Sequence, residues 1–274
     1  LPGCYAAPSA QLIKKYNKMS SMQIHTLKGY IQNIFLVEYP DKLLLLDGCS
    51  RADTDMLCDY IQHTLQRPLA DLKLIVVTHM HPDHAGGAHR LRDRTGAAVA
   101  AHPGTRRWYA GPLGRIAHGI DVLLTLWVAG RMGRPKRHIW YDALLRPDYL
   151  LQDAQPLPGF DEWQVICTPG HTDHDISLLH QPTHQIYVAD LVVMVKKTLV
   201  PPYPVYHPQE YRQSLARVAQ LKAERVFFAH LAARSGADIP FAELLSMAPV
   251  QPKTYWHSTK NRIARTLGGQ SRNH

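Results

Sequence analysis

A strand-like run that leads directly into a cluster of histidines constrains the fold of this chain most. The apolar segment Leu72–Val77 (LKLIVV) predicts a buried strand, and the following segment Thr78–Gly87 reads THMHPDHAGG. His79 and His81 alternate at the end of that strand, so both side chains leave the sheet on the same side. Pro82 cannot continue the strand, and a helix can begin there. The sequence therefore places several polar side chains together at one edge of a sheet.

The same run holds four potential metal ligands within six residues: His79, His81, Asp83 and His84. Imidazole nitrogens and carboxylate oxygens are ligands that a borderline divalent ion such as zinc accepts. Four such groups so close in sequence cannot all reach one ion comfortably, so the spacing predicts two neighbouring ions. A single histidine would be weak evidence in a chain that has 17 of them, but this arrangement is improbable by chance.

Three further candidates stand alone after predicted strands or turns. His171 ends the tetrapeptide Thr-Pro-Gly-His, Asp190 follows the apolar run QIYVA, and His230 follows RVFFA. The His-x-His-x-Asp-His run together with the Thr-Pro-Gly-His segment resembles the metallo-β-lactamase fold superfamily of metallohydrolases. The resemblance spans about residues 24 to 234, and its motifs are highly specific.

This resemblance implies two metal sites that share a carboxylate. The ligands of the first ion would be His79, His81 and His171. The ligands of the second ion would be Asp83, His84 and His230. Asp190 would bridge the two ions and keep their spacing.

Two more residues are expected to support the ligands. In relatives an Asp-Gly turn lies beneath the metals, and Asp47-Gly48 matches it, with an ordinary turn as the alternative interpretation. Asp47 would hydrogen-bond the ligand run, because ligand histidines need such partners to fix their tautomer and orientation. His174 lies three residues after His171 and is expected to support a ligand or contact the substrate.

The implied fold class is α/β, a four-layer αβ/βα sandwich of two mixed β-sheets with helices outside. Hydrophobic patterns and turn signals predict strands at 30–37, 43–46, 72–78, 97–101, 163–167, 175–180, 185–189 and 225–229. They predict helices at 53–66, 84–95 and 208–222, and a final helix in part of 240–266. Asp53 is the expected cap of the first helix. The candidate ligands all fall at strand ends or the turns after them, so they can converge on one edge.

One domain over residues 1–274 is expected, with two basic appendages. Residues 103–150 hold eight Lys and Arg against three acids, and residues 251–274 hold five against none. The formal charge of the chain is +9, of which these segments contribute +10 and the remainder −1. The core is therefore nearly neutral, and the basic character belongs to a helical insertion at about 103–150 and a C-terminal tail at about 251–274.

Within the insertion, the mostly apolar segment Ile116–Ala129 predicts a helix that runs into a basic end at Arg131–Arg137. The simplest interpretation is a helix packed on the core with its charges solvated. A lid over the pocket, a dimer contact and a membrane-surface contact through residues 116–137 are the alternatives. A lid of this composition would favour a substrate with an apolar portion.

Signals for a membrane or a compartment are few. No stretch approaches the roughly 18 to 20 consecutive apolar residues of a membrane span. No signal peptide is recognised, although residues upstream of Leu1 can have been removed. Cys4, Cys49, Cys58 and Cys167 lack the paired spacing of a zinc knuckle, and we interpret them as free thiols of a reducing compartment. A cytoplasmic location is therefore expected.

The ligand set predicts hydrolysis. Two divalent ions about 3.5 to 4 Å apart share a water and lower its pKa from about 15.7 towards 7. The predicted function is a dinuclear metal-dependent hydrolase whose metal-bridging hydroxide attacks an ester, lactone or thioester of a small, partly apolar substrate. Zinc is the expected metal, with iron or manganese as alternatives. Asp83 would also act catalytically, orienting the nucleophile and passing its proton to the leaving group.

Other activities share these ligands, so the site alone does not select a substrate. A phosphodiesterase is the first alternative, but the basic residues are not interleaved with a recognisable nucleic-acid module. A β-lactamase is a weaker one, because zinc β-lactamases lack a bridging carboxylate at the position of Asp190. A non-catalytic binding scaffold would be favoured by loss of ligands, and all seven are present. The sequence predicts no oligomeric state.

Overall fold

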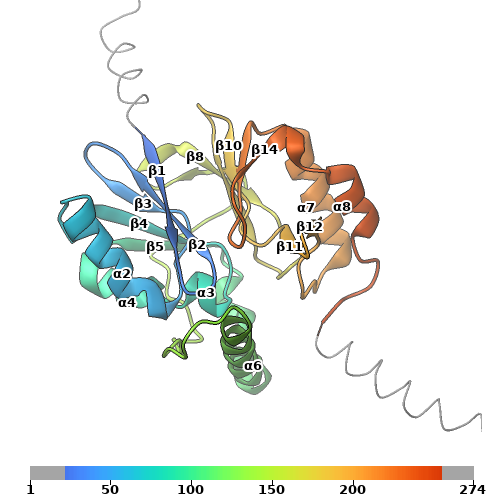
Figure 1. Cartoon of the computed structure of the whole chain (residues 1–274), viewed down its shortest axis with the longest axis horizontal. Coiled ribbons are helices and arrows are strands. Elements are labelled where there is room, and N and C mark those ends of the chain that lie inside the picture. Colours follow the sequence, from blue (N-terminus) through green and yellow to red (C-terminus); the bar gives the residue numbers. More distant parts are fainter. Residues whose placement is uncertain (1–21, 255–274) are drawn as a thin grey trace, which may run out of the picture.

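The computed structural model describes residues 22–254 of the chain. Two mixed six-stranded sheets face each other, and helices lie on their outer sides (Figure 1). The predicted αβ/βα sandwich is therefore confirmed.

The first sheet comes from the N-terminal part of the chain, with its strands in the order β1-β2-β3-β4-β5-β6. These strands are β1 (Gln23–Lys28), β2 (Asn33–Glu38), β3 (Leu43–Leu45), β4 (Leu72–Val77), β5 (Ala98–Ala101) and β6 (Tyr149–Leu150). Pairing is antiparallel from β1 to β3 and parallel from β3 to β6. Parallel strands are normally covered on both faces, which explains the nearly continuous apolar sequence of β4.

The second sheet has the order β14-β13-β10-β9-β8-β7. Its strands are β7 (Pro156–Leu157), β8 (Phe160–Cys167), β9 (Ile176–His180), β10 (Gln185–Tyr187), β13 (Arg225–Phe227) and β14 (Arg234–Ser235). Only β10 and β13 pair in parallel here. A separate antiparallel hairpin, which the sequence did not predict, consists of β11 (Val193–Val195) and β12 (Thr198–Val200).

Seven α-helices lie in the described part of the chain. They are α2 (Thr54–Asp59), α3 (Pro82–Ala85), α4 (Ala88–Thr95), α5 (Thr105–Trp108), α6 (Gly111–Arg131), α7 (Pro208–Leu221) and α8 (Phe241–Met247). Shorter helical turns are η1 (Arg51–Asp53), η2 (Tyr60–Thr64), η3 (Leu69–Asp71) and η4 (Gly236–Asp238). In Figure 1, α2 and α4 cover the first sheet, and α7 and α8 cover the second.

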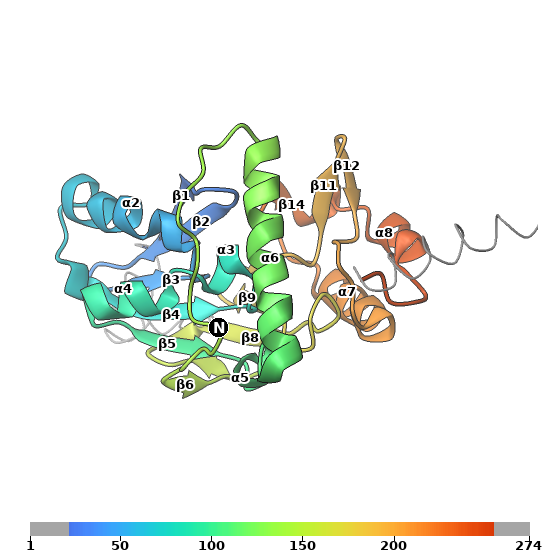
Figure 2. The same cartoon turned by 90° about the horizontal axis from the view of Figure 1, so that it is seen from below.

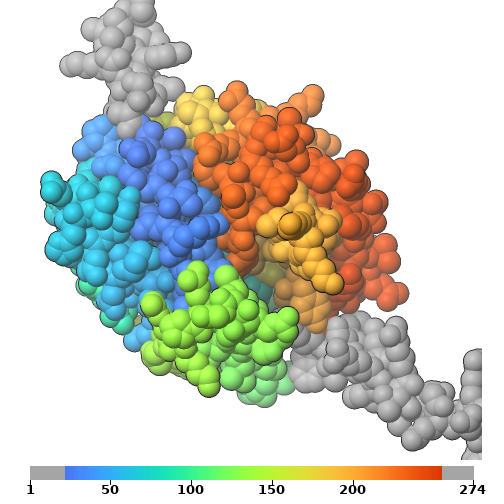
Figure 3. All heavy atoms as spheres, viewed as in Figure 1, coloured from blue at the N-terminus to red at the C-terminus, as the bar shows by residue number. Residues whose placement is uncertain are grey.

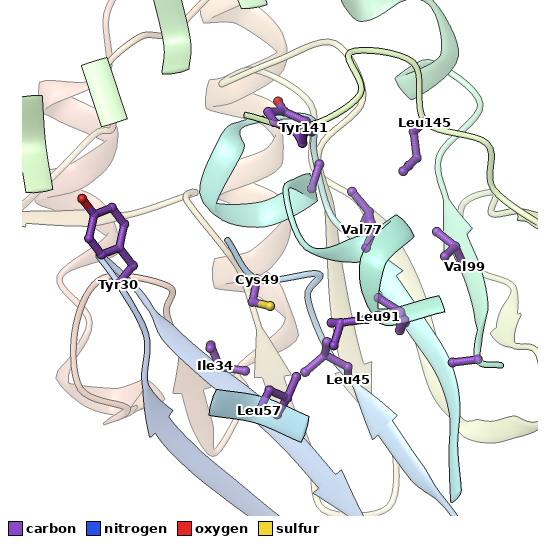
Figure 4. Packing of buried hydrophobic residues seen from close by; sticks show 14 of the residues in the cluster. Tyr30, Ile34, Leu45, Cys49, Leu57, Val77, Leu91, Val99, Tyr141 and Leu145 are labelled. Atoms are coloured by element: carbon purple, nitrogen blue, oxygen red, sulfur yellow. The ribbon is translucent and has the colours of Figure 1, made fainter. Parts of the chain in front are cut away.

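The core has three layers that follow the alternation of side chains along the strands. In β2, Phe35 and Val37 point into the layer between the two sheets, whereas Ile34 and Leu36 point into the layer beneath the helices. Figure 4 shows this helix-side layer of the first sheet, where Ile34 lies near Leu57 of α2. A third layer packs α7 and α8 against the second sheet.

Two helix predictions need correction. The helix predicted at 84–95 is divided into α3 and α4, because Gly86 and Gly87 lie against other backbone where no side chain fits. A Cβ on Gly86 would lie 2.2 Å from the carbonyl oxygen of Pro82. Asp53 does not cap its helix with its side chain; the Ser50 side chain accepts a hydrogen bond from the Ala52 amide instead.

The C-terminal expectations are tested only in part. The final helix ends at Met247, and the rest of the range predicted for it beyond residue 254 lies outside the described residues, as does most of the basic tail. Cys49, Cys58 and Cys167 are free thiols, as expected, and Cys4 lies outside the described residues.

Residues 103–150 include the long helix α6, which lies along one edge of the sandwich, below α3 in Figure 1 and in front of both halves in Figure 2. By length and composition α6 could cross a membrane. The expectation that no uninterrupted apolar run reaches the length of a membrane span still holds for this helix, because Arg115, His118 and Asp121 interrupt it. One such helix is weak evidence of a span, because helices that pack on a protein core pass the same test.

Candidate metal centre

The seven predicted ligands lie together at one edge of the sandwich, although they come from distant parts of the chain. Each follows the carboxyl end of a strand, or lies in α3 just beyond one. They are His79, His81, Asp83 and His84 after β4, His171 after β8, Asp190 after β10 and His230 after β13. The facing sheets therefore bring their strand ends to one place.

Three histidines form a first group around a common point. Nδ1 of His81 lies 3.0 Å from Nε2 of His79 and 3.0 Å from Nε2 of His171. All three side chains are almost completely buried. Such convergence of ring nitrogens is costly unless a cation or a proton lies between them.

The second group combines a carboxylate with two imidazoles. Oδ2 of Asp83 lies 3.4 Å from Nε2 of His84 and 3.3 Å from Nε2 of His230. His84 is fully buried, whereas the side chain of His230 is 26% exposed and faces the opening of the site. The second group is thus the one nearer to solvent.

Asp190 lies between the two groups and presents one oxygen to each. Its Oδ2 is 3.9 Å from Nε2 of His79 and 3.7 Å from Nε2 of His171. Its Oδ1 is 3.4 Å from Nε2 of His84 and 3.2 Å from Nε2 of His230. This is the geometry of a carboxylate able to bridge two ions.

Hydrogen bonds on the outer side of four rings indicate which nitrogen carries the proton. Nδ1 of His171 donates to the Pro204 carbonyl at 2.6 Å, and Nδ1 of His230 donates to the Ile31 carbonyl at 3.1 Å. Nδ1 of His84 faces Asp47 and Nδ1 of His79 faces the Thr78 hydroxyl. In each case Nε2 is directed at the centre, where a bound metal ion would replace any proton that this nitrogen carries.

Asp47 lies beneath the ligands and holds several of them in place. Its Oδ2 accepts from Nδ1 of His84 at 2.6 Å, from the Thr78 hydroxyl at 2.8 Å and from the Tyr187 hydroxyl at 2.8 Å. Its Oδ1 accepts from the backbone amide of Thr78 at 3.1 Å. The structure thus places Asp47 where the sequence comparison with relatives expected it.

His174 supports the ligand run through the backbone and does not line the cleft described below. Its Nε2 accepts a hydrogen bond from the Met80 amide at 3.1 Å, and its Nδ1 faces Asp173 at 2.6 Å. The Tyr141 hydroxyl donates to the carbonyl of the same Met80. The peptide between His79 and His81 is therefore fixed on both sides.

The electrostatics differ between the two groups. Burial, with the neighbouring imidazoles, holds the pKa of His79 and of His81 well below the ordinary value, so both rings are neutral. Burial also opposes protonation of His84, but the surrounding carboxylates overcome it and raise its pKa well above the ordinary value. The pKa of His230 is raised for the same reason, chiefly by Asp190.

The two carboxylates respond in the opposite direction. Burial alone would raise the pKa of Asp83, but His84 and His230 hold it below its ordinary value. The same imidazoles hold the pKa of Asp190 well below its ordinary value against burial. Both acids are therefore ionised at neutral pH, as ligands of a divalent cation must be.

Unpaired polar atoms support a fit to divalent metals. Nε2 of His84 and Oδ1 of Asp190 are buried, and within residues 22–254 neither has a hydrogen-bond partner. Buried polar groups are otherwise nearly always paired, so these atoms point at something the protein alone does not supply. The donor set of five imidazoles and two carboxylates is one that zinc, iron or manganese accepts.

Sequence reasoning did not identify Asp121, which α6 carries to the edge of the centre. Its Oδ2 lies 4.0 Å from Nε2 of His81 and accepts a hydrogen bond from the Tyr109 hydroxyl at 2.6 Å. Burial raises the pKa of Asp121 to about 6. An acidic residue within an otherwise apolar helical segment was the available signal.

A cleft of about 450 Å³ opens over the two groups. Figure 3 shows the hollow between the green atoms of α6 and the golden atoms of the β11–β12 hairpin. A large part of its apolar wall comes from α6 with the residue after it (Leu124, Val128, Met132) and from β11 (Val193, Met194, Val195), and Ile31 and residues 202–204 also line the cleft. The polar part of the wall includes Asp83, Asp190 and His230.

Known proteins resemble this chain in sequence. Residues 27–230 match the family model of the metallo-beta-lactamase superfamily. The chain is 22% identical over 223 residues to the probable metallo-hydrolase YflN of Bacillus subtilis (strain 168), which covers 76% of this chain and 83% of that protein.

Solved structures agree in fold. The metallo-beta-lactamase family protein TTHA1429 from Thermus thermophilus superimposes with a TM-score of 0.62 and 19% identity, over 90% of this chain and 83% of that one. TTHA1623, described in a di-iron-bound form, gives a TM-score of 0.52 and 22% identity over 78% of this chain and 95% of that one. With three quarters of the sequence inside the family model, the chain belongs to the metallo-beta-lactamase superfamily and is a metal-dependent hydrolase.

Proposed function

We propose that the protein hydrolyses an ester, lactone or thioester bond in a small substrate that carries an apolar portion. The observation that carries this proposal is the composition of the cleft. Aliphatic and methionine side chains of β11 and of α6 with the residue after it form much of its wall, and five of the candidate ligands lie among its polar lining: His81, Asp83, His171, Asp190 and His230. Such a cleft binds an apolar group on its wall and exposes a polar bond to the ligands.

Each group of ligands has a distinct part in this proposal. His79, His81 and His171 would bind a first divalent ion, and Asp83, His84 and His230 a second, with Asp190 between them. Two ions bound there would supply Lewis acidity and a water of lowered pKa. The protein orients the candidate ligands. Asp47 fixes the imidazole ring of His84, and the carbonyls of Pro204 and Ile31 fix those of His171 and His230.

Asp83 is proposed as the residue that moves the proton. It lies between His84 and His230 on the solvent side of the centre and lines the cleft. Its lowered pKa makes it a poor base in isolation, so its role would be to orient the attacking water and relay the proton to the leaving group.

Zinc is the proposed metal, and iron is the main alternative. The mixed nitrogen and oxygen ligands suit both, so geometry and supply decide between them. The di-iron form described for TTHA1623 supports keeping iron in the test.

Phosphodiester hydrolysis remains the second candidate, on the strength of the basic insertion. Against it, none of the described residues that line the cleft is a lysine or an arginine. A phosphate substrate is usually bound by such cations. A β-lactamase or a non-catalytic scaffold has no feature of the site in its favour. The free thiols fit the reducing cytoplasm that we propose as the location.

The test is a hydrolysis panel with the zinc-loaded and the iron-loaded protein. The panel comprises an aliphatic lactone, an acyl thioester, a nitrophenyl ester, a bis-nitrophenyl phosphodiester and a chromogenic cephalosporin, with His79→Ala as the inactive control. We expect turnover of the carboxylic substrates, increasing with the length of the acyl chain. Activity on the phosphodiester alone would overturn the proposal, and equal activity in the control would point to a contaminant.

A further inference from the structure

The outward side of α6 is apolar where a surface helix is normally polar. Leu113, Ile116, Ile120, Leu123 and Trp127 follow each other at alternating steps of three and four residues, so they form one stripe along the helix. Leu113 is 77% exposed, Ile116 55%, Leu123 66% and Trp127 61%. We call these five residues the outer stripe, and it runs for about 21 Å along the axis.

The opposite side of α6 is anchored on the protein. His118, Asp121, Val122, Thr125 and Ala129 are buried there. The buried carboxylate of Asp121 accepts the Tyr109 hydroxyl, and the ring of His118 packs against Tyr109 and Tyr141. If α6 left the domain to span a bilayer, these polar groups would lie in hydrocarbon without hydrogen-bond partners. The outer stripe is therefore the apolar side of α6 that the described residues leave exposed, away from the cleft, to contact a partner.

The surroundings of the stripe are basic. Residues 106–140 contain seven Lys and Arg and a single acid, the buried Asp121. Arg115, Arg131, Arg134 and Lys136 are exposed, and none of them forms an ion pair with a carboxylate within residues 22–254. The guanidinium of Arg131 lies 5.4 Å from the centre of the Trp127 ring, so charge and aromatic surface stand side by side. A partner of this face must combine apolar material with negative charge.

We propose that the outer stripe of α6 docks the enzyme on a phospholipid bilayer with anionic headgroups. Helices that lie in a membrane interface combine Leu and Trp on one face with Lys and Arg beside it. A second copy of the chain fits less well, because a two-fold contact would bring two sets of unpaired arginines together. The anionic headgroups would pair with those arginines, and the hydrocarbon beneath the headgroups would contact the outer stripe.

Docking would also orient the cleft. Leu124, Val128 and Met132 of the same helix line it, and Val128 and Met132 are exposed at its rim. Across the cleft the hairpin exposes Met194 and Val195, with Lys196 and Lys197 at its turn. An apolar rim beside the docked helix lets an acyl chain pass from the bilayer into the site. This consequence for the substrate rests on the proposed function, whereas docking itself does not.

The experiment measures binding to vesicles, which requires no turnover. Full-length protein is sedimented with vesicles of phosphatidylcholine and phosphatidylglycerol (3:1) and with vesicles of phosphatidylcholine alone. We expect at least tenfold stronger partitioning onto the anionic vesicles at low salt, and weaker partitioning in 0.5 M salt. Trp127 emission should shift to the blue on binding, and this shift should be absent in Trp127→Phe.

Two variants separate the apolar and the charged contributions. Leu123→Gln with Trp127→Gln, and Arg131→Glu with Arg134→Glu, should each lower partitioning at least tenfold. Val250→Gln and Lys73→Glu change exposed residues of the same kinds elsewhere and should leave binding unchanged. The stripe variant should keep its activity on a water-soluble ester, because neither residue lines the cleft.

Three results would overturn the docking proposal. These are absence of binding to anionic vesicles at low salt, binding that all variants retain, and a dimer in sedimentation velocity that Leu123→Gln with Trp127→Gln dissociates. The last would identify the stripe as a contact between copies. Failure of the hydrolysis panel with normal vesicle binding would instead count against the proposed function alone.

Discussion

Asp121 of the inserted helix faces His81 of the ligand run, with Oδ2 of the acid 4.0 Å from Nε2 of the imidazole. The other ring nitrogen of His81 points to His79 and His171. Nε2 of His81 has no hydrogen-bond partner within the described residues, so a small movement would let it donate to Asp121. The insertion thus reaches the metal centre itself.

Replacing this acid should weaken the centre. In Asp121→Asn we expect a metal affinity about 10-fold lower and a similar loss in kcat/KM, because a ligand histidine loses the carboxylate that orients it. Tyr109→Phe removes only the hydroxyl that donates to Asp121 and should have a smaller effect. Competition with a chromogenic chelator at pH 7.5 measures the affinity. Equal affinity in Asp121→Asn and the parent protein would show that the acid has no part in holding the metal.

The fold and the candidate ligands were predictable because short local motifs carry the family resemblance that implies both. A buried strand such as Leu72–Val77 is visible as an apolar run, and His79 and His81 follow it at the spacing of a strand end. The position of Asp121 depends on how a helix far from any motif folds back over the edge of the sandwich. No periodicity within the helix contains that information, so only the three-dimensional arrangement reveals it.

The hairpin β11–β12 was missed for a related reason. Its strands are three residues each and directly follow Asp190, so the apolar run that they contribute is too short to distinguish from a loop. The division between α3 and α4 was missed because the sequence does not show that Pro82 and Arg51 lie against Gly86.

Asp83→Asn tests the proposed proton transfer. The amide oxygen still offers a ligand, so we expect the metal content to stay within about twofold of the parent, while kcat falls by about 100-fold or more because the amide cannot relay a proton. Metal analysis by mass spectrometry and steady-state kinetics on the best substrate measure the two effects. Normal turnover in this variant would remove Asp83 from the proton path and leave it as a ligand only.

Asp47 should matter for stability as well as for the ligands. Its carboxylate accepts from Thr78, His84 and Tyr187, all buried, so Asp47→Ala leaves several donors without a partner. We expect a loss of roughly 4 kcal/mol in the free energy of unfolding of the chelator-treated protein. Tyr187→Phe removes one of these bonds and should cost roughly 1.5 kcal/mol. Urea unfolding measures both, and similar losses in the two variants would argue against a central role for Asp47.

Metal binding should release protons from the second group of ligands. In chelator-treated protein the raised pKa values keep His84 and His230 protonated at pH 7, whereas His79 and His81 are neutral. Affinity for the second ion should therefore rise with pH, by up to about tenfold per unit for each proton displaced. Calorimetry at pH 7 in buffers of different ionisation enthalpy counts the protons. The number of protons released on metal binding should be smaller by one in His230→Gln than in the parent protein. If the parent protein releases no protons, His84 and His230 are not protonated in the metal-free state.

The same groups set the pH dependence of stability in chelator-treated protein. His84 and His230 have raised pKa values, so their contribution is complete below the unfolded value of about 6.5 and is lost as the pH rises through the higher folded values. Asp83 and Asp190 have lowered pKa values, so their contribution is present above about pH 4 and is lost as the pH falls further. Urea unfolding without metal should therefore show less stability at pH 9 than at pH 6.5. Saturation with zinc should abolish this loss of stability between pH 6.5 and pH 9, because bound ions replace the protons between the carboxylates and the imidazoles. A decline that persists in zinc-saturated protein would place the responsible groups elsewhere in the chain.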